Sequence, residues 1–292
     1  MSRRRLAIIA ALSTALSLTA CGGGGGTTAE SVASGPPVAT ATQPGSDSTT
    51  APTATQPAAP ASTAPAPASL DPKLLEDFAN GFASESDPDT MRGEALSLTV
   101  PGSVAYAYVS HLANVSESAL DGGNPYSDSQ VDEVKDASFK LCDDPSDEDT
   151  CSTFTDFKVD ASGKIVDMRV NGKTISDRLT VGNGQSVSSK GSKFKFLTAY
   201  KSITSNSLFV TVKIESGSKP ISPNIYSASY RSPEGKQREA TDAFGPTDLD
   251  ANSNSIVTMV FKGVTAGGKV TLDGCVGKDC TAVFNASMKV GR

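Results

Sequence analysis

The sequence predicts two folded parts in series, an α+β domain over residues 71–179 and an all-β sandwich over residues 180–292. Apolar residues recur at helical spacing up to about residue 120 and alternate with period two after it. From residue 180 onward, turn residues separate short alternating runs. Residues 71–179 carry 9 Lys and Arg against 22 Asp and Glu, whereas residues 180–292 carry 14 against 8, so the net charge changes from −13 to +6.

Residues 1–20 have the features of a secretory signal peptide. Arginines at positions 3–5 precede an apolar run over residues 6–20. Fifteen helical residues rise about 22 Å, which is less than the roughly 30 Å of hydrocarbon that a transmembrane helix crosses. We therefore expect an export signal and no permanent span. The arginines leave twin-arginine export open beside the general secretory route.

The apolar run ends in Leu18-Thr19-Ala20-Cys21, and Gly22 follows. This segment resembles the lipobox of bacterial lipoproteins, in which a Leu and two small residues precede the cysteine that is diacylated. The resemblance implies that the mature chain begins at Cys21 and is anchored on the outer face of the cytoplasmic membrane. Two acyl chains suffice for stable anchoring. An ordinary secretory signal with a chance cysteine is the alternative.

Residues 21–70 are predicted to be a linker that follows the lipidated cysteine. Between Gly22 and Leu70, 42 of 49 residues are Ala, Thr, Pro, Gly or Ser. This composition buries too little apolar surface to offset the entropy of ordering, so we expect a disordered spacer. Its Thr and Pro content resembles the O-mannosylated stalks of actinobacterial surface lipoproteins, and an unmodified linker is the alternative. The resemblance implies four candidate glycosylation sites: Thr49, Thr50, Thr53 and Thr55.

Four further cysteines are Cys142, Cys151, Cys275 and Cys280. Export favours disulfides, and four cysteines allow three pairings. The pairs Cys142–Cys151 and Cys275–Cys280 keep each bond within one predicted domain, where each would link a β-hairpin. A redox or metal site at Cys275 and Cys280 is the alternative, but no second pair of metal ligands accompanies them.

The first domain begins with helix signals. Asp71-Pro72 and Asp87-Pro88 each combine an N-cap residue with a proline in the first helical turn. A third helix is predicted over residues 103–120, before Asp121-Gly122-Gly123. Its apolar stripe has six members: Val104, Ala107, Tyr108, His111, Leu112 and Val115.

Three strands are predicted next, over residues 131–142, 151–160 and 164–171, with a tight turn at Asp160-Ala161-Ser162-Gly163. The predicted order is helices followed by a curved antiparallel sheet, whose hairpin over residues 154–172 reads F-T-D-F-K-V-D-A-S-G-K-I-V-D-M-R-V-N-G. Over about 100 residues this pattern resembles the nuclear-transport-factor-2-like cone fold. This family contains isomerases and dehydratases that use Asp, Tyr or His in the cone cavity, and many non-catalytic members.

Tyr106, Tyr108 and His111 are the residues that could face such a cavity. The chain has no identifiable Asp–Tyr or His–Asp motif, so no catalytic residue is carried over from the family. A single His on an apolar helix stripe is expected to be a packing residue. The acidic run at residues 143–149 lacks the spacing of a calcium loop. We expect it to form a solvated hairpin tip, with weak calcium binding as the alternative.

The second domain is predicted to be an immunoglobulin-like β-sandwich. Six short runs in about 110 residues are typical of a sandwich. The run over residues 196–214 and the Y-R-S-P-E-G segment at residues 230–235 resemble small immunoglobulin-like domains of Gram-positive lipoproteins, most of which have no known catalysis. The predicted strands cover residues 193–204, 208–215, 225–231, 255–261, 269–275 and 281–290.

Composition excludes some classes of function. A net charge of −6, 6% aromatic residues and the absence of Trp argue against a nucleic-acid binder. One His and five Cys leave few groups for nucleophilic, metal or general-base chemistry near neutral pH, so we expect no cofactor, no metal and no catalysis. We expect binding or scaffolding at the cell envelope. A small-molecule carrier or sensor using the cone pocket is the alternative, and an enzyme of the cone superfamily is the third hypothesis.

The opposite charges of the two domains favour docking between them. We expect the β-domain to present Lys190, Lys193, Lys195 and Lys201 towards the acidic domain or an anionic envelope polymer. Two separately solvated surfaces of unequal composition are the alternative. The expected partners are therefore the membrane, through the N-terminal diacylglycerol, and an envelope protein or anionic glycan.

Overall fold

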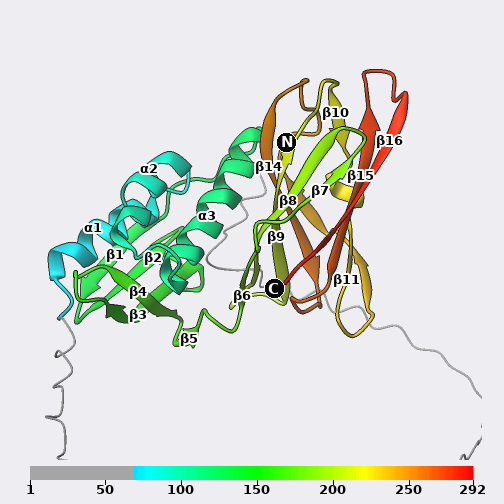
Figure 1. Cartoon of the computed structure of the whole chain (residues 1–292). Helices are drawn as coiled ribbons and strands as arrows, with labels where there is room; N and C mark the ends of the chain where they lie inside the picture. The colour runs from blue at the N-terminus through cyan, green and yellow to red at the C-terminus, as the bar shows by residue number, and fades with distance from the viewer. Residues whose placement is uncertain (1–68, 292) are drawn as a thin grey trace, which may run out of the picture. The chain divides into compact units, whose positions relative to one another are not determined.

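Antiparallel β-sheet dominates the structure, a computed structural model that describes residues 69–291 (Figure 1). Three α-helices and sixteen β-strands lie within these residues, all of which belong to one unit of mutual contacts. No helix in this part of the chain is long and apolar enough to cross a membrane. The predicted signal peptide, lipidated Cys21 and glycosylation sites lie outside the described residues.

The three α-helices begin where the sequence predicts. The Asp71 side chain accepts a hydrogen bond from the Lys73 backbone N–H, and the Asp87 side chain accepts from Thr90 N–H. Ser103 caps the third helix in the same way. The helices are α1 (Pro72–Ala83), α2 (Pro88–Gly93) and α3 (Val104–Asp121), and single 3₁₀ turns follow at Leu96–Leu98, Glu148–Thr150 and Ile225–Ser227.

The first sheet is a five-stranded antiparallel meander with the helices on one side (Figure 1). The prediction of a single strand over residues 131–142 is wrong, because the chain reverses at Asp136 and Ala137. Both residues have positive φ angles, of 49° and 57°, as in a two-residue hairpin turn of type I′. Neither is glycine, so the usual turn signal is absent. The strands are β1 (Gln130–Lys135), β2 (Ser138–Cys142), β3 (Cys151–Val159), β4 (Ile165–Val170) and β5 (Lys173–Thr174).

Aromatic side chains fill the space between the helices and this sheet. Phe82 of α1 lies 5.2 Å from Phe154 of β3, measured between ring centroids. Phe154 in turn stacks on Phe139 of β2 at 4.5 Å. Phe78, Phe82, Phe139 and Phe154 are each no more than 1% exposed. The side of the sheet that faces the helices is therefore occupied by the protein's own core.

The remaining strands form two antiparallel sheets. The six-stranded sheet contains β6 (Leu179–Val181), β7 (Ser186–Ser189), β8 (Ser192–Lys201), β9 (Ser207–Glu215), β13 (Asp242–Phe244) and β14 (Asn254–Lys262). The five-stranded sheet contains β10 (Ile221–Pro223), β11 (Ser229–Arg231), β12 (Gln237–Glu239), β15 (Lys269–Val276) and β16 (Ala282–Lys289). The predicted strand over residues 225–231 is wrong in its first half. A 3₁₀ turn begins it, because Ala228 N–H bonds back to the Ile225 carbonyl.

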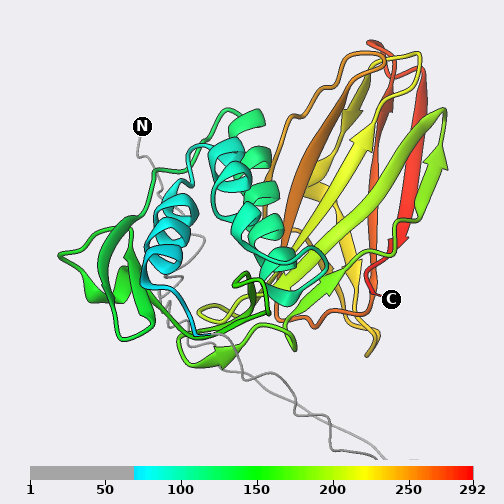
Figure 2. The ribbon, with the colours of Figure 1, turned by 60° about the vertical axis from the view of Figure 1, so that its left-hand side comes forward.

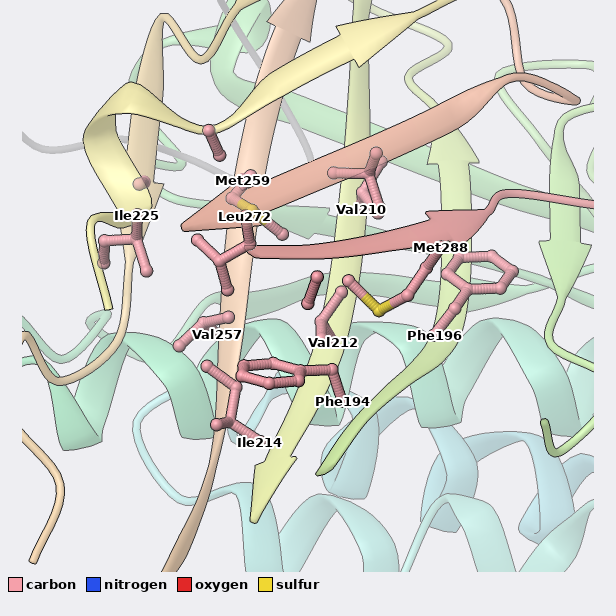
Figure 3. Close-up of a cluster of buried hydrophobic side chains, with 14 of the residues drawn as sticks. Phe194, Phe196, Val210, Val212, Ile214, Ile225, Val257, Met259, Leu272 and Met288 are labelled. Carbon is pink, nitrogen blue, oxygen red and sulfur yellow. The ribbon is translucent and has the colours of Figure 1, made fainter. Parts of the chain in front are cut away.

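The two sheets share one apolar core. Val212 of β9 and Val257 of β14 lie in the same cluster as Leu272 of β15 and Met288 of β16 (Figure 3). All four side chains are at most 3% exposed, and removing this apolar surface from water stabilises the pair of sheets.

The outer face of the six-stranded sheet is also buried, because α3 packs against it (Figure 2). Phe209 and Thr211 of β9, and Thr258 and Val260 of β14, point away from the shared core and are all at most 6% exposed. β9 and β14 are thus apolar runs buried on both faces, and the half-buried alternation expected for them is wrong. The α3 helix is likewise buried on more than its predicted stripe, since Ala105, among others, is inaccessible.

Both predicted disulfides are present. Cys142 of β2 and Cys151 of β3 face each other directly and are bonded. Cys275 of β15 is bonded to Cys280 in the turn before β16. The first bond therefore links neighbouring strands, and the second links β15 to the turn of its own hairpin, so both lie within a hairpin as expected.

Candidate functional site

Buried polar groups join α3 to the six-stranded sheet; we call this contact the seam. His111 is 1% exposed, and its Nδ1 lies 2.8 Å from Thr198 Oγ1. Ser118 Oγ lies 2.6 Å from Thr258 Oγ1. The Ser255 hydroxyl donates to the Asp121 carboxylate at 2.6 Å. These bonds satisfy polar groups that would be costly to bury alone.

Burial lowers the pKa of His111 to about 3, so the ring is neutral at physiological pH. The structure places His111 in the interior, with its ring centroid 5.6 Å from that of Tyr200. Tyr108 is 2% exposed, and its ring centroid lies 5.1 Å from that of Tyr200. Tyr106 is half-buried and stands on another side of the helix, two positions before Tyr108. The three residues considered for a cavity therefore do not gather around an open space.

Sequence reasoning missed the buried carboxyl group of Glu85. Glu85 is 3% exposed and accepts a 2.8 Å hydrogen bond from the Ser129 hydroxyl. Burial raises its pKa, the Ser129 hydrogen bond lowers it, and the charges of Asp143 and Asp128 raise it, which together give a pKa of about 8. No local signal marks Glu85, because the residues that bury it are brought in by the loop before β1.

The acidic run at residues 143–149 satisfies much of its bonding within the loop. Asp144 Oδ1 accepts from the Ser146 backbone N–H and hydroxyl at 2.9 and 2.6 Å. Glu148 pairs with Lys140 at 3.1 Å. Among residues 69–291, no group of three or more His, Cys, Asp or Glu side chains is placed to hold a metal ion.

A hollow of about 590 Å³ lies where the first sheet meets the end of β8. Positively charged side chains from β4, β5, the segment before β6 and β8 surround it. We call it the basic hollow, and its lining residues are Arg169, Gly172, Lys173, Thr174, Asp177, Arg178 and Lys201.

Three of the four cations in the basic hollow donate to neutral oxygens. Lys173 Nζ donates to the Ile203 carbonyl at 3.4 Å, and Arg178 Nη1 donates to the Ser202 carbonyl at 3.1 Å. Lys201 Nζ donates to the Asn206 side-chain oxygen at 2.6 Å and to the Val264 carbonyl at 2.9 Å.

Carboxylates do not neutralise these three cations. Within residues 69–291, no carboxylate oxygen lies within 4.0 Å of a side-chain nitrogen of Lys173, Arg178 or Lys201. Arg169 does have such a partner, because its Nε lies 3.4 Å from Asp156 Oδ2. Asp177 accepts from the Thr174 hydroxyl at 3.0 Å.

The electrostatics of the basic hollow agree with this geometry. Partial burial and then the positive charge of Arg178 lower the pKa of Lys201. Two positive groups therefore lie close together without a carboxylate between them. Such an arrangement attracts anions, whereas the lining has no His, Cys or paired carboxylates to act as a nucleophile or base.

The structure separates the four lysines that the sequence groups together. Lys201 lines the basic hollow at one end of β8, whereas Lys193 lies at the other end, about 25 Å away at roughly 3.3 Å per residue. Lys195 faces Lys213 directly across β8 and β9, and Lys190 is in the turn before β8. The length of β8 therefore keeps Lys193 and Lys201 apart, and their presentation to an anionic partner stays a prediction.

Three cations of the basic hollow were missed by sequence reasoning. Arg169, Lys173 and Arg178 fall within ten residues of each other, in a domain where only 9 residues are basic and 22 are acidic. This local concentration of positive charge was the available signal.

The expected docking of the two halves by opposite charge gets no support from the ion pairs. Each ion pair found within residues 69–291 joins residues of the same half, as Lys158 and Asp167 do at 2.8 Å. The seam consists of apolar packing and mostly neutral hydrogen bonds.

Comparison of the chain with protein-family models, curated proteins and solved structures finds no match. The function is therefore argued from the residues of this chain.

Proposed function

We propose that this protein is a lipid-anchored, extracytoplasmic protein of the cell envelope that acts by binding or scaffolding and not by catalysis. Cys21 carries the anchor, and residues 21–70 hold the folded part away from the membrane. The partners are the membrane, through diacylglycerol, and an envelope protein or anionic glycan. The observation that carries the scaffolding role is the seam.

The seam makes residues 69–291 suited to act as one rigid body. Opening it would expose Phe209 and Val260 to water and break the bonds of His111 and Ser118. A buried donor or acceptor that loses its partner costs about 1–3 kcal/mol. A body held together in this way, on a long spacer, is suited to present a fixed surface to a partner.

We further propose that residues 71–179 are a cone-like domain and residues 180–292 an immunoglobulin-like domain. Three helices precede a five-stranded antiparallel meander in the first part, and register shifts interrupt its β1–β2 and β3–β4 pairs. Two antiparallel sheets share one core in the second part. These features support the resemblances found in the sequence.

The alternative of a small-molecule carrier is less well supported. It needs an open apolar pocket between the helices and the first sheet. Phe78, Phe82, Phe139 and Phe154 occupy that space with their own rings. An enzyme needs accessible acid–base groups, whereas His111 is buried and neutral.

Anchoring is tested by expressing the full chain in a Gram-positive host that processes lipoproteins and feeding a labelled fatty acid. We expect the wild type to carry label and to fractionate with membranes. Protease added to intact cells should release a folded fragment by cutting within residues 21–70. The Cys21→Ser variant should carry no label, while Thr19→Ala, which keeps a small residue before the cysteine, should behave like the wild type. Label on Cys21→Ser, or a chain inaccessible to external protease, would overturn the proposal.

A further inference from the structure

We propose that the basic hollow is a binding site for phosphate groups that carry at least two closely spaced negative charges, as in a phosphorylated sugar or a pair of neighbouring phosphodiesters. The inference adds a ligand class to the binding role proposed above and rests on that role. The charge balance, the available donors and the size of the hollow favour such a ligand.

The charge balance of the hollow calls for more than one negative charge. Lys173, Arg178 and Lys201 have no carboxylate partner among residues 69–291, whereas Asp177 supplies one negative charge to the lining. Arg169 is already shared with Asp156. Two positive charges therefore remain uncompensated. A singly charged carboxylate would leave one of them, whereas a phosphate monoester or two phosphodiesters would balance both.

The cations keep hydrogen-bond donors free for a ligand. A guanidinium group has five N–H donors in a planar fork that fits phosphate oxygens in pairs. Arg178 shows one bond, to the Ser202 carbonyl, and Lys173 shows one, to the Ile203 carbonyl. These bonds fix both side chains at the wall of the hollow and leave their other donors available. Preorganised donors lose less entropy when a ligand binds.

Arg178 and Lys201 have an energetic reason to bind an anion. Partial burial and then the positive charge of Arg178 lower the pKa of Lys201, and the second of these causes is repulsion between the two charges. An anion between them would convert this repulsion into attraction. The volume of about 590 Å³ accommodates such a ligand, since small-molecule sites span about 300–1,000 Å³.

The test is calorimetric titration of the full chain in detergent at fixed ionic strength. The probes are a hexose 1-phosphate, a short poly(glycerol phosphate) and citrate, the last as a carboxylate of similar charge. We expect saturable binding of the phosphate probes, at least about tenfold tighter than citrate. If the polymer binds much tighter than the monomer, the source is an envelope polymer. If they bind equally, it is a soluble phosphorylated sugar.

Variants locate the binding. The double variant Lys173→Gln, Arg178→Gln should weaken phosphate binding at least about tenfold, since it removes two charged donors. The matched control Lys193→Gln, Lys195→Gln makes the same charge change at the other end of β8 and should change binding less than about twofold. Lys173 and Arg178 also donate hydrogen bonds to loop carbonyls, so their removal could disturb the loop. The variant Lys173→Arg retains the positive charge and should keep phosphate binding. Unfolding curves check that each variant folds.

Three results would overturn the proposal. These are no saturable phosphate binding at millimolar concentrations, equal loss of binding in the control, and citrate binding as tight as phosphate. None of them changes the labelling and fractionation of the Cys21→Ser variant, so failure of this site is distinguishable from failure of the anchoring proposal.

Discussion

Replacing Glu85 by Gln should stabilise the protein above neutral pH and change the pH dependence of its unfolding. The Glu85 pKa is about 8 in the folded protein, against an ordinary value of 4.5. Below pH 4.5 the carboxyl is protonated in both states, so its contribution to stability is fully present. As the pH rises from 4.5 to 8, the unfolded chain loses this proton while the folded chain keeps it, and stability is lost.

The magnitude follows from the size of the pKa difference. Each pKa unit corresponds to about 1.4 kcal/mol, so 4.5 to about 8 gives an upper limit of about 5 kcal/mol. Glutamine has nearly the same shape as the protonated acid, can accept the Ser129 hydrogen bond and does not ionise. The variant should therefore match the wild type near pH 4.5 and exceed its stability by several kcal/mol at pH 8.

His111 makes folding stability rise with pH, which is the opposite of the Glu85 effect, and it does so at lower pH. Its pKa falls from 6.5 to about 3 on folding, so stability is lost as the pH falls through this range. Between pH 4.5 and 6.5 the effects of Glu85 and His111 on stability cancel, so the stability of the wild type should be nearly constant over this range. The His111 contribution is the same in both proteins. It therefore cancels when the free energy of unfolding of the wild type is subtracted from that of Glu85→Gln.

Urea unfolding from pH 4 to 8.5, followed by circular dichroism, measures this difference. Glu76→Gln, a change at an exposed glutamate of α1, is the control and should follow the wild-type curve. A constant difference between Glu85→Gln and the wild type, within about 1 kcal/mol over this range, would refute the reasoning.

Two further predictions concern the seam. Thr198→Val removes the 2.8 Å partner of His111 Nδ1 at nearly constant volume, and urea unfolding should show a loss of about 1–3 kcal/mol; an unchanged midpoint would mean that this bond adds nothing. Gly122→Ala places a Cβ 2.9 Å from the Gly245 backbone nitrogen and should cost about 1–3 kcal/mol by thermal unfolding. In the control Gly93→Ala the new Cβ meets nothing within 4 Å, so this helix position should gain roughly 0.5–1 kcal/mol. A loss of the same size in both variants would argue against close packing at Gly122.

Local chemistry explains most of what could be predicted. The caps at Asp71 and Asp87 act within three residues, and Cys142 with Cys151 lies within one hairpin. The same local view failed at Asp136-Ala137, where the chain makes a tight turn without a glycine. The pairing of β1 with β2 fixes this turn, so the turn forms without the glycine that would favour it in an isolated peptide.

The candidate site could be predicted only in part. Lys201 was singled out, but its grouping with Lys193 and Lys195 assumed that residues close in sequence share a surface. Along a strand, eight residues separate side chains by about 25 Å. The true neighbours of Lys201 come from β5 and the segment before β6, because β6 pairs with β8.

The sequence by itself determined the helix starts, the long strands of the second half and the two disulfides, because capping, periodicity and short cysteine spacing act over a few residues. Only the tertiary structure decided that β9 and β14 are buried on both faces, that Glu85 is enclosed, and that Lys173, Arg178 and Lys201 surround one hollow. These features depend on contacts between residues far apart in the chain. Their energies come from burial and from charge proximity, which a linear pattern does not contain.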